Sequence, residues 1–205
     1  MSHVVLYMSM SLDGFIAGPN DVEGNGFGDG GMRLHRWLET SRGSHHTSFR
    51  PDDPVSRIVF DEVMATGAVV IGKRFGDLVD YWGGNHHDDV PMFVLTHEAP
   101  SSSPHANVHY VTDGVQSCVD QAKRAAGGRD VMMHGAAVAQ EALRAGVLDV
   151  LEIQLVPVLF GQGRKLFDAL GPDHIELQEV RTLQASECLH IRYEVATGRD
   201  VTSVR

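Results

Sequence analysis

Short apolar runs alternate with amphipathic stretches along most of the chain. Ala68–Gly72 (AVVIG) and Pro91–Thr96 (PMFVLT) are β-rich runs of the length of buried strands. Pro54–Thr66 and Gly114–Ala126 instead carry apolar residues at helical spacing, and glycine follows each of them. An alternation of strands and helices is typical of an α/β protein whose mostly parallel sheet is covered on both faces.

The same pattern predicts the other elements. Further strands are predicted at His3–Met10, Ala106–Val111, Asp130–Met133, Val147–Leu159, Ile175–Leu183 and Cys188–Val195, and further helices at Met32–Leu38 and Ala136–Ala145. The last two strands follow each other without a helix, which favours antiparallel additions at one edge of the sheet. Gly14–Gly31 and Gly43–Asp53 are predicted as loops. The 205 residues suit a single domain, predicted over 1–195 with a tail at 196–205.

Composition and charge narrow the classes of partner. With 17 basic and 27 acidic residues the net charge is −10, which disfavours nucleic acid and anionic membrane surfaces. Cys118 and Cys188 lack CxxC spacing and are typical of buried thiols in a reducing compartment. The first residues lack a basic n-region, and no apolar run approaches the ~20 residues of a membrane span. We therefore expect a cytoplasmic protein with no nucleic-acid or membrane partner.

Three strand ends carry candidate chemistry. AVVIG runs into Lys73, Arg74 and Phe75, which indicates either an anion-binding turn or an ordinary strand-to-helix turn. DVMMHGAAVAQEAL, beginning at Asp130, places small residues where a strand enters a helix, as pyrophosphate sites do, but it lacks the GxGxxG fingerprint. PVLFGQGRKLF, beginning at Pro157, contains a G-x-G turn that either faces a ligand or simply ends a strand.

Together and in this order, five segments resemble the dihydrofolate-reductase-like superfamily. The similarity is closest to the reductase domain of the bifunctional riboflavin-biosynthesis deaminase-reductases. The segments are SLDGFIAG (11–18), VVIGKRF (69–75), PMFVLT (91–96), HGAAVAQEALRAGVLD (134–149) and PVLFGQGRKLF (157–167). The resemblance implies a three-layer α/β fold with a mostly parallel sheet, antiparallel edge strands and helices on both faces.

The resemblance also implies an NADPH site. In a position-by-position match, residues of the first strand and its loop contact the nicotinamide, and residues of the two turns contact the phosphates. Residues just after the third strand contact the 2′-phosphate or the adenosine. The implied cofactor residues are Ser9, Ile16, Ala17, Gly72, Lys73, Arg74, Thr96, His97, Gly135, Ala136, Ala137 and Val138.

Several positions depart from the family pattern. Ala136 stands where relatives usually have a second glycine, and His134 stands where the riboflavin-pathway reductases have a glutamate. Leu34 aligns with the acidic residue by which dihydrofolate reductases bind the pterin. The turn Gly-Lys-Arg replaces an Ala-Asp turn, and there is no zinc-deaminase motif. Leu34 and His134 concern the substrate half of the site, and Ala136 narrows the approach to the second turn. The part of the resemblance that survives these departures is the cofactor half.

Candidates for the substrate half each have a structural alternative. Asp13 is the predicted catalytic acid, or else a carboxylate that binds the loop backbone. Trp37 is predicted to stack on a planar substrate, or else to be a core residue. Gln154 aligns with a pocket position in the family and shares a strand face with Glu152. The run His86–Asp89 has ligand-type side chains on one loop, and no metal site is predicted there.

The predicted reaction is hydride transfer from NADPH to a C=N or C=O group of a small, heterocyclic substrate. The proton donor is Asp13, His35 or an ordered water. The alternatives are a non-catalytic dinucleotide-binding or ligand-sensing protein, and a scaffold with neither ligand. Relatives commonly pair through late strands, and Ile175–Leu183 and Cys188–Val195 alternate apolar with charged residues. We therefore predict a homodimer, unless that apolar face covers the protein's own core.

Overall fold

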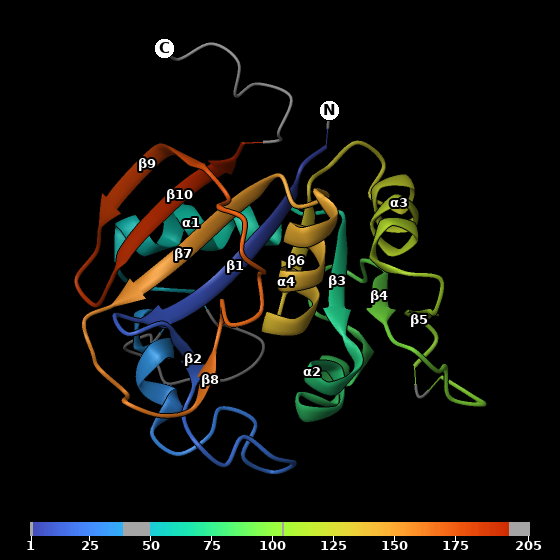
Figure 1. The fold of residues 1–205 in the computed structure, drawn as a ribbon, viewed down its shortest axis with the longest axis horizontal. Coiled ribbons are helices and arrows are strands. Elements are labelled where there is room, and N and C mark those ends of the chain that lie inside the picture. Colours follow the sequence, from blue (N-terminus) through green and yellow to red (C-terminus); the bar gives the residue numbers. More distant parts are fainter. Residues whose placement is uncertain (1, 39–49, 104, 197–205) are drawn as a thin grey trace.

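A computed structural model describes residues 2–38, 50–103 and 105–196. Its centre is an eight-stranded sheet in the order β5-β4-β3-β6-β1-β7-β10-β9 (Figure 1). The strands are β1 (Val4–Ser11), β3 (Ala68–Gly72), β4 (Met92–Leu95), β5 (Val108–Val111), β6 (Val131–His134), β7 (Val150–Val156), β9 (Leu177–Gln184) and β10 (Leu189–Val195). The six strands from β5 to β7 are parallel, whereas β10 is antiparallel to β7 and to β9. The predicted mostly parallel sheet with antiparallel edge strands is confirmed.

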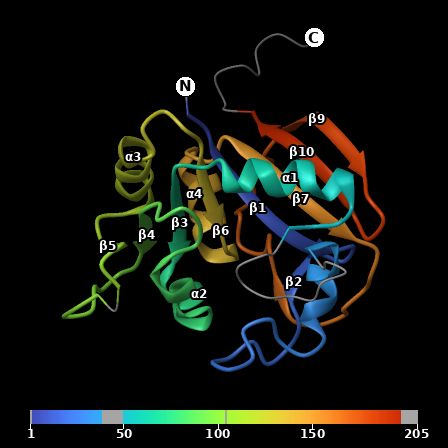
Figure 2. The ribbon, with the colours of Figure 1, turned by 180° about the vertical axis from the view of Figure 1, so that it is seen from behind.

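Helices cover both faces of this sheet. α3 (Val115–Ala125) and α4 (Ala136–Ala145) lie on the face seen in Figure 1, and α1 (Pro54–Met64) crosses the opposite face in Figure 2. Alternation along β1 explains the two layers, because Val4 and Leu6 pack in the α3/α4 core and Val5 and Tyr7 pack in the α1 core.

Smaller elements lie beyond the carboxyl ends of the parallel strands, at the lower edge in Figure 1. They are α2 (Lys73–Leu78), the 3-10 helices η1 (Gly31–Leu38) and η2 (Asp80–Gly84), and an antiparallel pair of short strands, β2 (Phe15–Ala17) and β8 (Arg164–Lys165). Because active sites of open α/β sheets lie outside the carboxyl ends of the strands, this edge is where a site is expected.

The local sequence explains where α1 begins and where α4 ends. The Asp53 carboxylate accepts hydrogen bonds from the backbone N–H groups of Val55 (3.0 Å) and Ser56 (2.7 Å), and Pro54 occupies the first helical turn of α1. α4 ends at Gly146, whose φ of 67° is left-handed.

The structure differs from the predicted elements at several places. The predicted helix Met32–Leu38 is a 3-10 helix, and the predicted strand Val147–Leu159 is ordered as a strand only over Val150–Val156. β2 lies within the predicted loop Gly14–Gly31. Most of the predicted loop Gly43–Asp53 and of the predicted tail 196–205 lies outside the described residues, so the tail and the domain boundary stay predictions.

None of the helices in the described part of the chain is both long enough and apolar enough to cross a bilayer.

Candidate active-site cleft

A cleft of about 310 Å³ runs along the carboxyl ends of the parallel strands. One end, here called the β5 end, is formed by residues that follow β4 and β5, including Thr96, His97 and Gly114. The other, the β1 end, is formed by Met8 on β1, Ile16 on β2 and neighbouring side chains. The two ends lie at opposite sides of β3 and β6 in the sheet order. The volume is typical of a small-molecule site.

The predicted cofactor residues converge on this cleft although they come from separate elements. All of them except Ser9 line it, namely Ile16, Ala17, Gly72, Lys73, Arg74, Thr96, His97, Gly135, Ala136, Ala137 and Val138. The structure thus brings together the turns that sequence reasoning selected.

The amino terminus of α4 faces the cleft. Gly135 precedes the helix with φ 104° and ψ 146°, a conformation that L side chains rarely adopt. No side chain caps the helix, so the first-turn N–H groups at Ala136, Ala137 and Val138 have no side-chain acceptor. Ala137 is exposed, and Ala136 is almost buried at 8% exposure. An uncapped helix start with small residues is suited to an anion.

A sharp backbone turn does not explain why residue 72 is a glycine. Its φ of −85° and ψ of 149° are extended backbone that any residue adopts. A Cβ built at this position meets nothing within 4 Å, and the position lines the cleft. Because Gly72 has no side chain, the cleft stays open for a ligand next to this turn.

Asp21 joins the basic residues of the cleft, and sequence reasoning did not select it. Its Oδ2 accepts hydrogen bonds from Arg74 Nη1 (3.0 Å) and from Arg164 Nε (2.5 Å). Burial opposes ionisation of Asp21, but the hydrogen bonds and charges of Arg164 and Arg74 outweigh it and lower the pKa of the carboxyl. Lys73 similarly pairs with Asp77 at 2.7 Å. The cationic side chains of the cleft are thus each paired with a carboxylate of the protein.

Two histidines, His35 on η1 and His134 at the end of β6, line the same cleft. Phe27 lies against the His35 ring at a centroid distance of 4.5 Å, and Phe75 lies against the His134 ring at 4.8 Å. Burial lowers the pKa of His35 to about 4 and that of His134 to about 4, and the proximity of His35 lowers the latter further. Both rings are therefore neutral near pH 7.

Asp13 does not line the cleft. Its carboxylate accepts hydrogen bonds from Ser11 Oγ (2.6 Å), Phe160 N (3.1 Å) and Gly161 N (2.7 Å). The Ser11 hydrogen bond is the main cause that lowers the pKa of Asp13 to about 2. The carboxylate joins the turn after β1 to the loop after β7, so the structural alternative fits Asp13 better than the predicted catalytic role.

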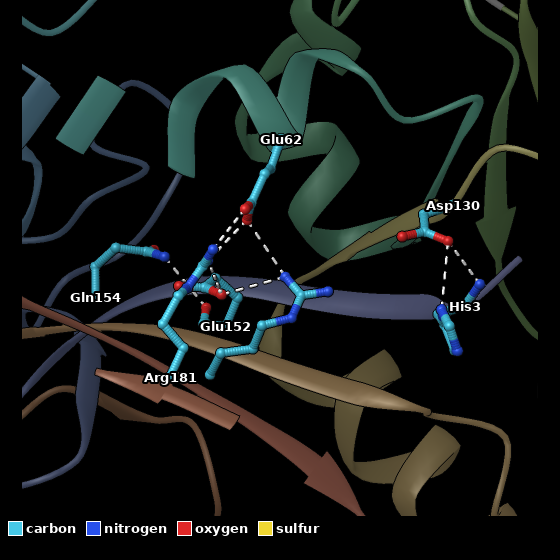
Figure 3. Close-up of polar contacts among 7 residues, drawn as sticks. His3, Glu62, Asp130, Glu152, Gln154 and Arg181 are labelled. Carbon is cyan, nitrogen blue, oxygen red and sulfur yellow. Dashed lines mark hydrogen bonds and ion pairs between the residues drawn. The ribbon is translucent and has the colours of Figure 1, made fainter. Parts of the chain in front are cut away.

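Ser9, Trp37 and Gln154 also lie away from the cleft. Trp37 Nε1 donates a hydrogen bond to Ser9 Oγ at 2.8 Å, and the indole meets the ring of His190 edge-on at 5.1 Å. Gln154 is buried beside Glu152, and its amide donates to the Glu152 carbonyl at 3.2 Å (Figure 3). The core alternative for Trp37 therefore fits, and the predicted substrate pocket around Trp37 and Gln154 is separate from the cleft.

The His86–Asp89 run forms a turn. His87 Nε2 lies 3.2 Å from Thr66 Oγ1 and 3.1 Å from the Thr66 carbonyl, and His86 Nδ1 lies 2.7 Å from His87 Nδ1. Across residues 2–38, 50–103 and 105–196, no three histidine, cysteine or acidic side chains form a group that could hold a metal ion.

The strand order, the late antiparallel strands and a cleft across the carboxyl ends define a dihydrofolate-reductase-like protein. The fold is similar to dihydrofolate reductase of Enterococcus faecalis solved with NADP(H), with a TM-score of 0.57 and 16% identity over 95% of this chain and 97% of that one. The chain belongs to the RibD C-terminal domain family, whose model matches residues 2–191. The resemblance inferred from the five segments is confirmed.

Two further solved structures are similar across nearly all of this chain. A protein of Shewanella sp. PV-4 assigned to riboflavin biosynthesis has a TM-score of 0.71 and 17% identity, over 95% of this chain and 99% of its own. The riboflavin biosynthesis reductase Rib7 of Saccharomyces cerevisiae has a TM-score of 0.56 and 14% identity, over 96% and 89%. At such identities the likeness concerns the fold. Comparison with curated protein sequences gives no match.

Proposed function

We propose that the protein is an NADPH-dependent reductase that transfers a hydride to a C=N or C=O group of a small, heterocyclic substrate. The observation that carries this proposal is the convergence of the predicted cofactor residues, drawn from four turns and strands, on one cleft. Membership of the RibD C-terminal domain family supports a reductase. The NADP(H) in the E. faecalis relative and the reductase activity named for Rib7 support the same class of chemistry.

The cleft fits an extended dinucleotide. Thr96 and His97, together with Arg74, would hold the adenosine half and its 2′-phosphate, and the α4 amino terminus would bind the pyrophosphate. Ile16 and Ala17 would line the nicotinamide at the β1 end, where the bound cofactor supplies the hydride. Phe27, Phe75 and Met8 make that end apolar, and closure of it around the bound cofactor and substrate would keep water away from the reacting atoms.

A charge placed at the α4 amino terminus tests this proposal. Ala137→Asp puts a carboxylate where the pyrophosphate would bind, while an acidic residue in the first turn does not harm the helix. Fluorescence titration should show NADPH affinity falling at least about tenfold, the scale of one repelled charge in such a site. Ala137→Asn, a neutral control of the same shape, should bind NADPH nearly as well as the natural chain. Equal affinity for the natural chain and the Asp variant would place the dinucleotide elsewhere.

A non-catalytic dinucleotide-binding or ligand-sensing protein is the second candidate. It is favoured by the position of Asp13, which is engaged with backbone N–H groups outside the cleft. The acids that line the cleft are Asp21, paired with two arginines, and Glu141 on α4. Absorbance at 340 nm separates the two candidates. Oxidation of NADPH with any member of a panel of carbonyls, pterins and pyrimidines supports the reductase, whereas tight binding without turnover supports the second candidate.

Homodimer formation and a cytoplasmic location remain part of the proposal. Part of the apolar face predicted for pairing covers the protein's own core, because Ile175 and Tyr193 pack against it. Leu177, Val180 and Leu189 stay exposed at 42%, 50% and 36%. They lie along the edge hairpin, with Leu177 and Leu189 at its opposite ends, and a second copy of the chain could cover this edge.

A further inference from the structure

Three polar side chains hold together the loop between β2 and η1. Asn25 Nδ2 donates to the Asn20 carbonyl and to Asp29 Oδ1, both at 3.0 Å. Asn20 Nδ2 in turn donates to Asp29 Oδ2 at 2.7 Å. The Asn25 amide is therefore the donor that joins two acceptors on opposite sides of the loop.

The residue after Asn25 makes this asparagine chemically different from the others. The chain has four asparagines, and only Asn25 precedes a glycine, because Asn20, Asn85 and Asn107 precede an aspartate, a histidine and a valine. Gly26 has no Cβ that would hinder an approach to or from its backbone nitrogen. Its N–H donates to no acceptor among the described residues. Both residues are partly exposed, so water and hydroxide have access to the pair.

We propose that Asn25 is a modification site, at which deamidation through a succinimide formed with Gly26 opens the loop. The deprotonated Gly26 nitrogen attacks Cγ of Asn25 and forms the new N–C bond, while the bond from Cγ to Nδ2 breaks and ammonia leaves. Water then opens the succinimide at either of its carbonyls, which gives aspartate or isoaspartate. The overall change consumes water and releases ammonia, without oxidation or reduction.

The product places a carboxylate where the amide used to donate. Asp29 Oδ1 and the Asn20 carbonyl are both acceptors, so both hydrogen bonds of the Asn25 side chain are lost. Two carboxylates then face each other, and like charges at such a distance repel. Asp21, which follows Asn20 in the chain, forms ion pairs with two arginines of the cleft, so opening of the loop would reach the cleft. The inference does not depend on the proposed function, because the reaction uses loop residues alone.

Peptide mapping by mass spectrometry tests the modification. In the full-length protein incubated at about pH 8, we expect a mass gain of about 1 Da that fragmentation assigns to residue 25. The gain should accumulate at least about tenfold faster at Asn25 than at Asn85 or Asn107, which are followed by residues with a Cβ. No gain at residue 25, or an equally fast gain at either of the other two asparagines, would overturn the modification.

Gly26→Ala is the matched variant, because its methyl group hinders the attacking nitrogen. The backbone at Gly26 is not left-handed, and a Cβ there would lie 3.2 Å from the Leu78 carbonyl oxygen, a tight contact that a small shift relieves. The variant should deamidate at Asn25 at least about tenfold more slowly than the natural chain. An unchanged rate would overturn the succinimide route.

Asn25→Asp produces one of the two products directly and tests the opening of the loop. The backbone N–H groups of Gly18 and Asp29 close the loop through hydrogen bonds of 2.9 and 2.7 Å to carbonyls on its opposite side. Hydrogen exchange of these two amides should be at least about fivefold faster in the variant. The amide of Met92 on β4, far from the loop in the sheet order, should exchange as before and so report an intact fold. Unchanged exchange at Gly18 and Asp29 would overturn the opening of the loop.

Discussion

Asp21 forms ion pairs with two guanidinium groups of the cleft, those of Arg74 and Arg164. Arg74 Nη1 and Arg164 Nε both donate to Oδ2 of Asp21, and Arg164 Nη2 also donates to Oδ1. Arg74 donates in addition to the Asp21 backbone carbonyl. Arg74 stays half exposed, with 51% of its side chain accessible, so it can exchange one acceptor for another at little cost. If NADPH binds as proposed, its phosphate would compete with Asp21 for Arg74, and the affinity for NADPH would depend on both partners.

Arg74 is expected to distinguish NADPH from NADH. A guanidinium can bind a 2′-phosphate bidentately, whereas a ribose hydroxyl gains nothing from the charge. Arg74→Ala should weaken NADPH by about 1.5–3 kcal/mol, the scale of a hydrogen bond to a charged group, and should leave NADH nearly unchanged. Asp21→Asn, which removes the competing carboxylate, should act in the opposite direction. Fluorescence titration of both cofactors measures these changes, and equal losses for NADPH and NADH in Arg74→Ala would contradict the assignment.

The buried imidazole of His134 should make stability depend on pH. Its pKa is about 4 in the folded chain against 6.5 for the free side chain, chiefly because of burial. Between these values the unfolded chain takes up a proton that the folded chain cannot, so stability is complete above about pH 6.5 and falls as the pH falls toward 4. From pH 7.5 to 5.0 this group should remove about 2 kcal/mol from the free energy of unfolding.

Urea unfolding at the two pH values tests this linkage. His134→Gln should reduce the difference in unfolding free energy between pH 7.5 and 5.0 by about 2 kcal/mol, because the variant has no proton to take up there. His174→Gln, at an exposed position, should leave that difference unchanged. An unaltered pH dependence in His134→Gln would mean that the imidazole is accessible to protons in the folded state.

α1 is held against the sheet by a cluster of two acids and two arginines. Figure 3 shows Glu62 extending from α1 toward Arg181 and Glu152 on the strands below. Arg181 donates to Glu62 Oε1 (2.6 Å) and Glu152 Oε2 (3.0 Å), and Arg192 Nη1 lies 3.3 Å from Glu152 Oε2. Glu152 is fully buried, which raises the pKa of its carboxyl while both arginines oppose that shift. The cluster fixes the position of β7, β9 and β10 under the helix.

Loss of the central carboxylate should destabilise the fold. Glu152→Gln leaves Arg181 and Arg192 with a single carboxylate partner, Glu62. Arg192 loses the closer of its two carboxylate contacts, whereas Arg181 keeps its contact with Glu62. The free energy of unfolding should fall by about 1.5–3 kcal/mol in urea titrations. Asp61→Asn, on the same helix but in an exposed pair with Arg50, should cost less than about 1 kcal/mol. Comparable losses in the two variants would show that burial of the cluster adds nothing to its strength.

Periodicity identified the long elements, and chemistry at the strand ends selected residues that the fold brings together at one cleft. AVVIG is ordered as a strand over the predicted residues, and Ala136–Ala145 is the predicted helix. β2 and β8 are three and two residues long, too short for any periodic pattern, and they form only because each pairs with the other. The ion pairs of Asp21 with the two arginines could not be predicted from the sequence for a similar reason. A single acid in a glycine-rich loop carries no spacing signal, and its two partners lie 53 and 143 residues away.

All but one of the residues predicted for the cofactor line the cleft, whereas Trp37 and Gln154, predicted for the substrate, do not. Trp37 and Gln154 were selected by alignment with relatives, and in the fold they lie beside Ser9 and Glu152, away from the cleft. His35 was named from the sequence only as a candidate proton donor, and its place with His134 in the wall of the cleft depends on the tertiary fold. Backbone turns that bind phosphates follow local sequence rules, whereas a pocket wall is assembled from side chains whose direction depends on tertiary packing.

At the scale of the whole molecule, the sheet ends in a long strand with one free edge. β9 occupies the last position of the sheet order and pairs only with β10 among the described strands, and most of its residues are exposed. β5, at the opposite edge, is only four residues long. Long exposed edge strands with apolar side chains favour pairing with a strand of another chain. In a two-fold arrangement, the exposed Leu177, Val180 and Leu189 would be covered by the same edge of a second copy.

Light scattering coupled to size exclusion tests the dimer. We expect a mass of twice the single-chain 22.4 kDa at micromolar concentration. Val180→Lys should shift the mass to that of one chain, because a lysine on an edge strand cannot be buried against its own copy and needs water around its charge. Val22→Lys makes the same substitution at an exposed valine in the loop after β2, and it should remain dimeric. Because Val180 is half exposed in the single chain, its replacement should leave the melting temperature of the monomer nearly unchanged. A natural chain that elutes at the single-chain mass would refute the dimer, and a Val180→Lys dimer would move the interface to another face.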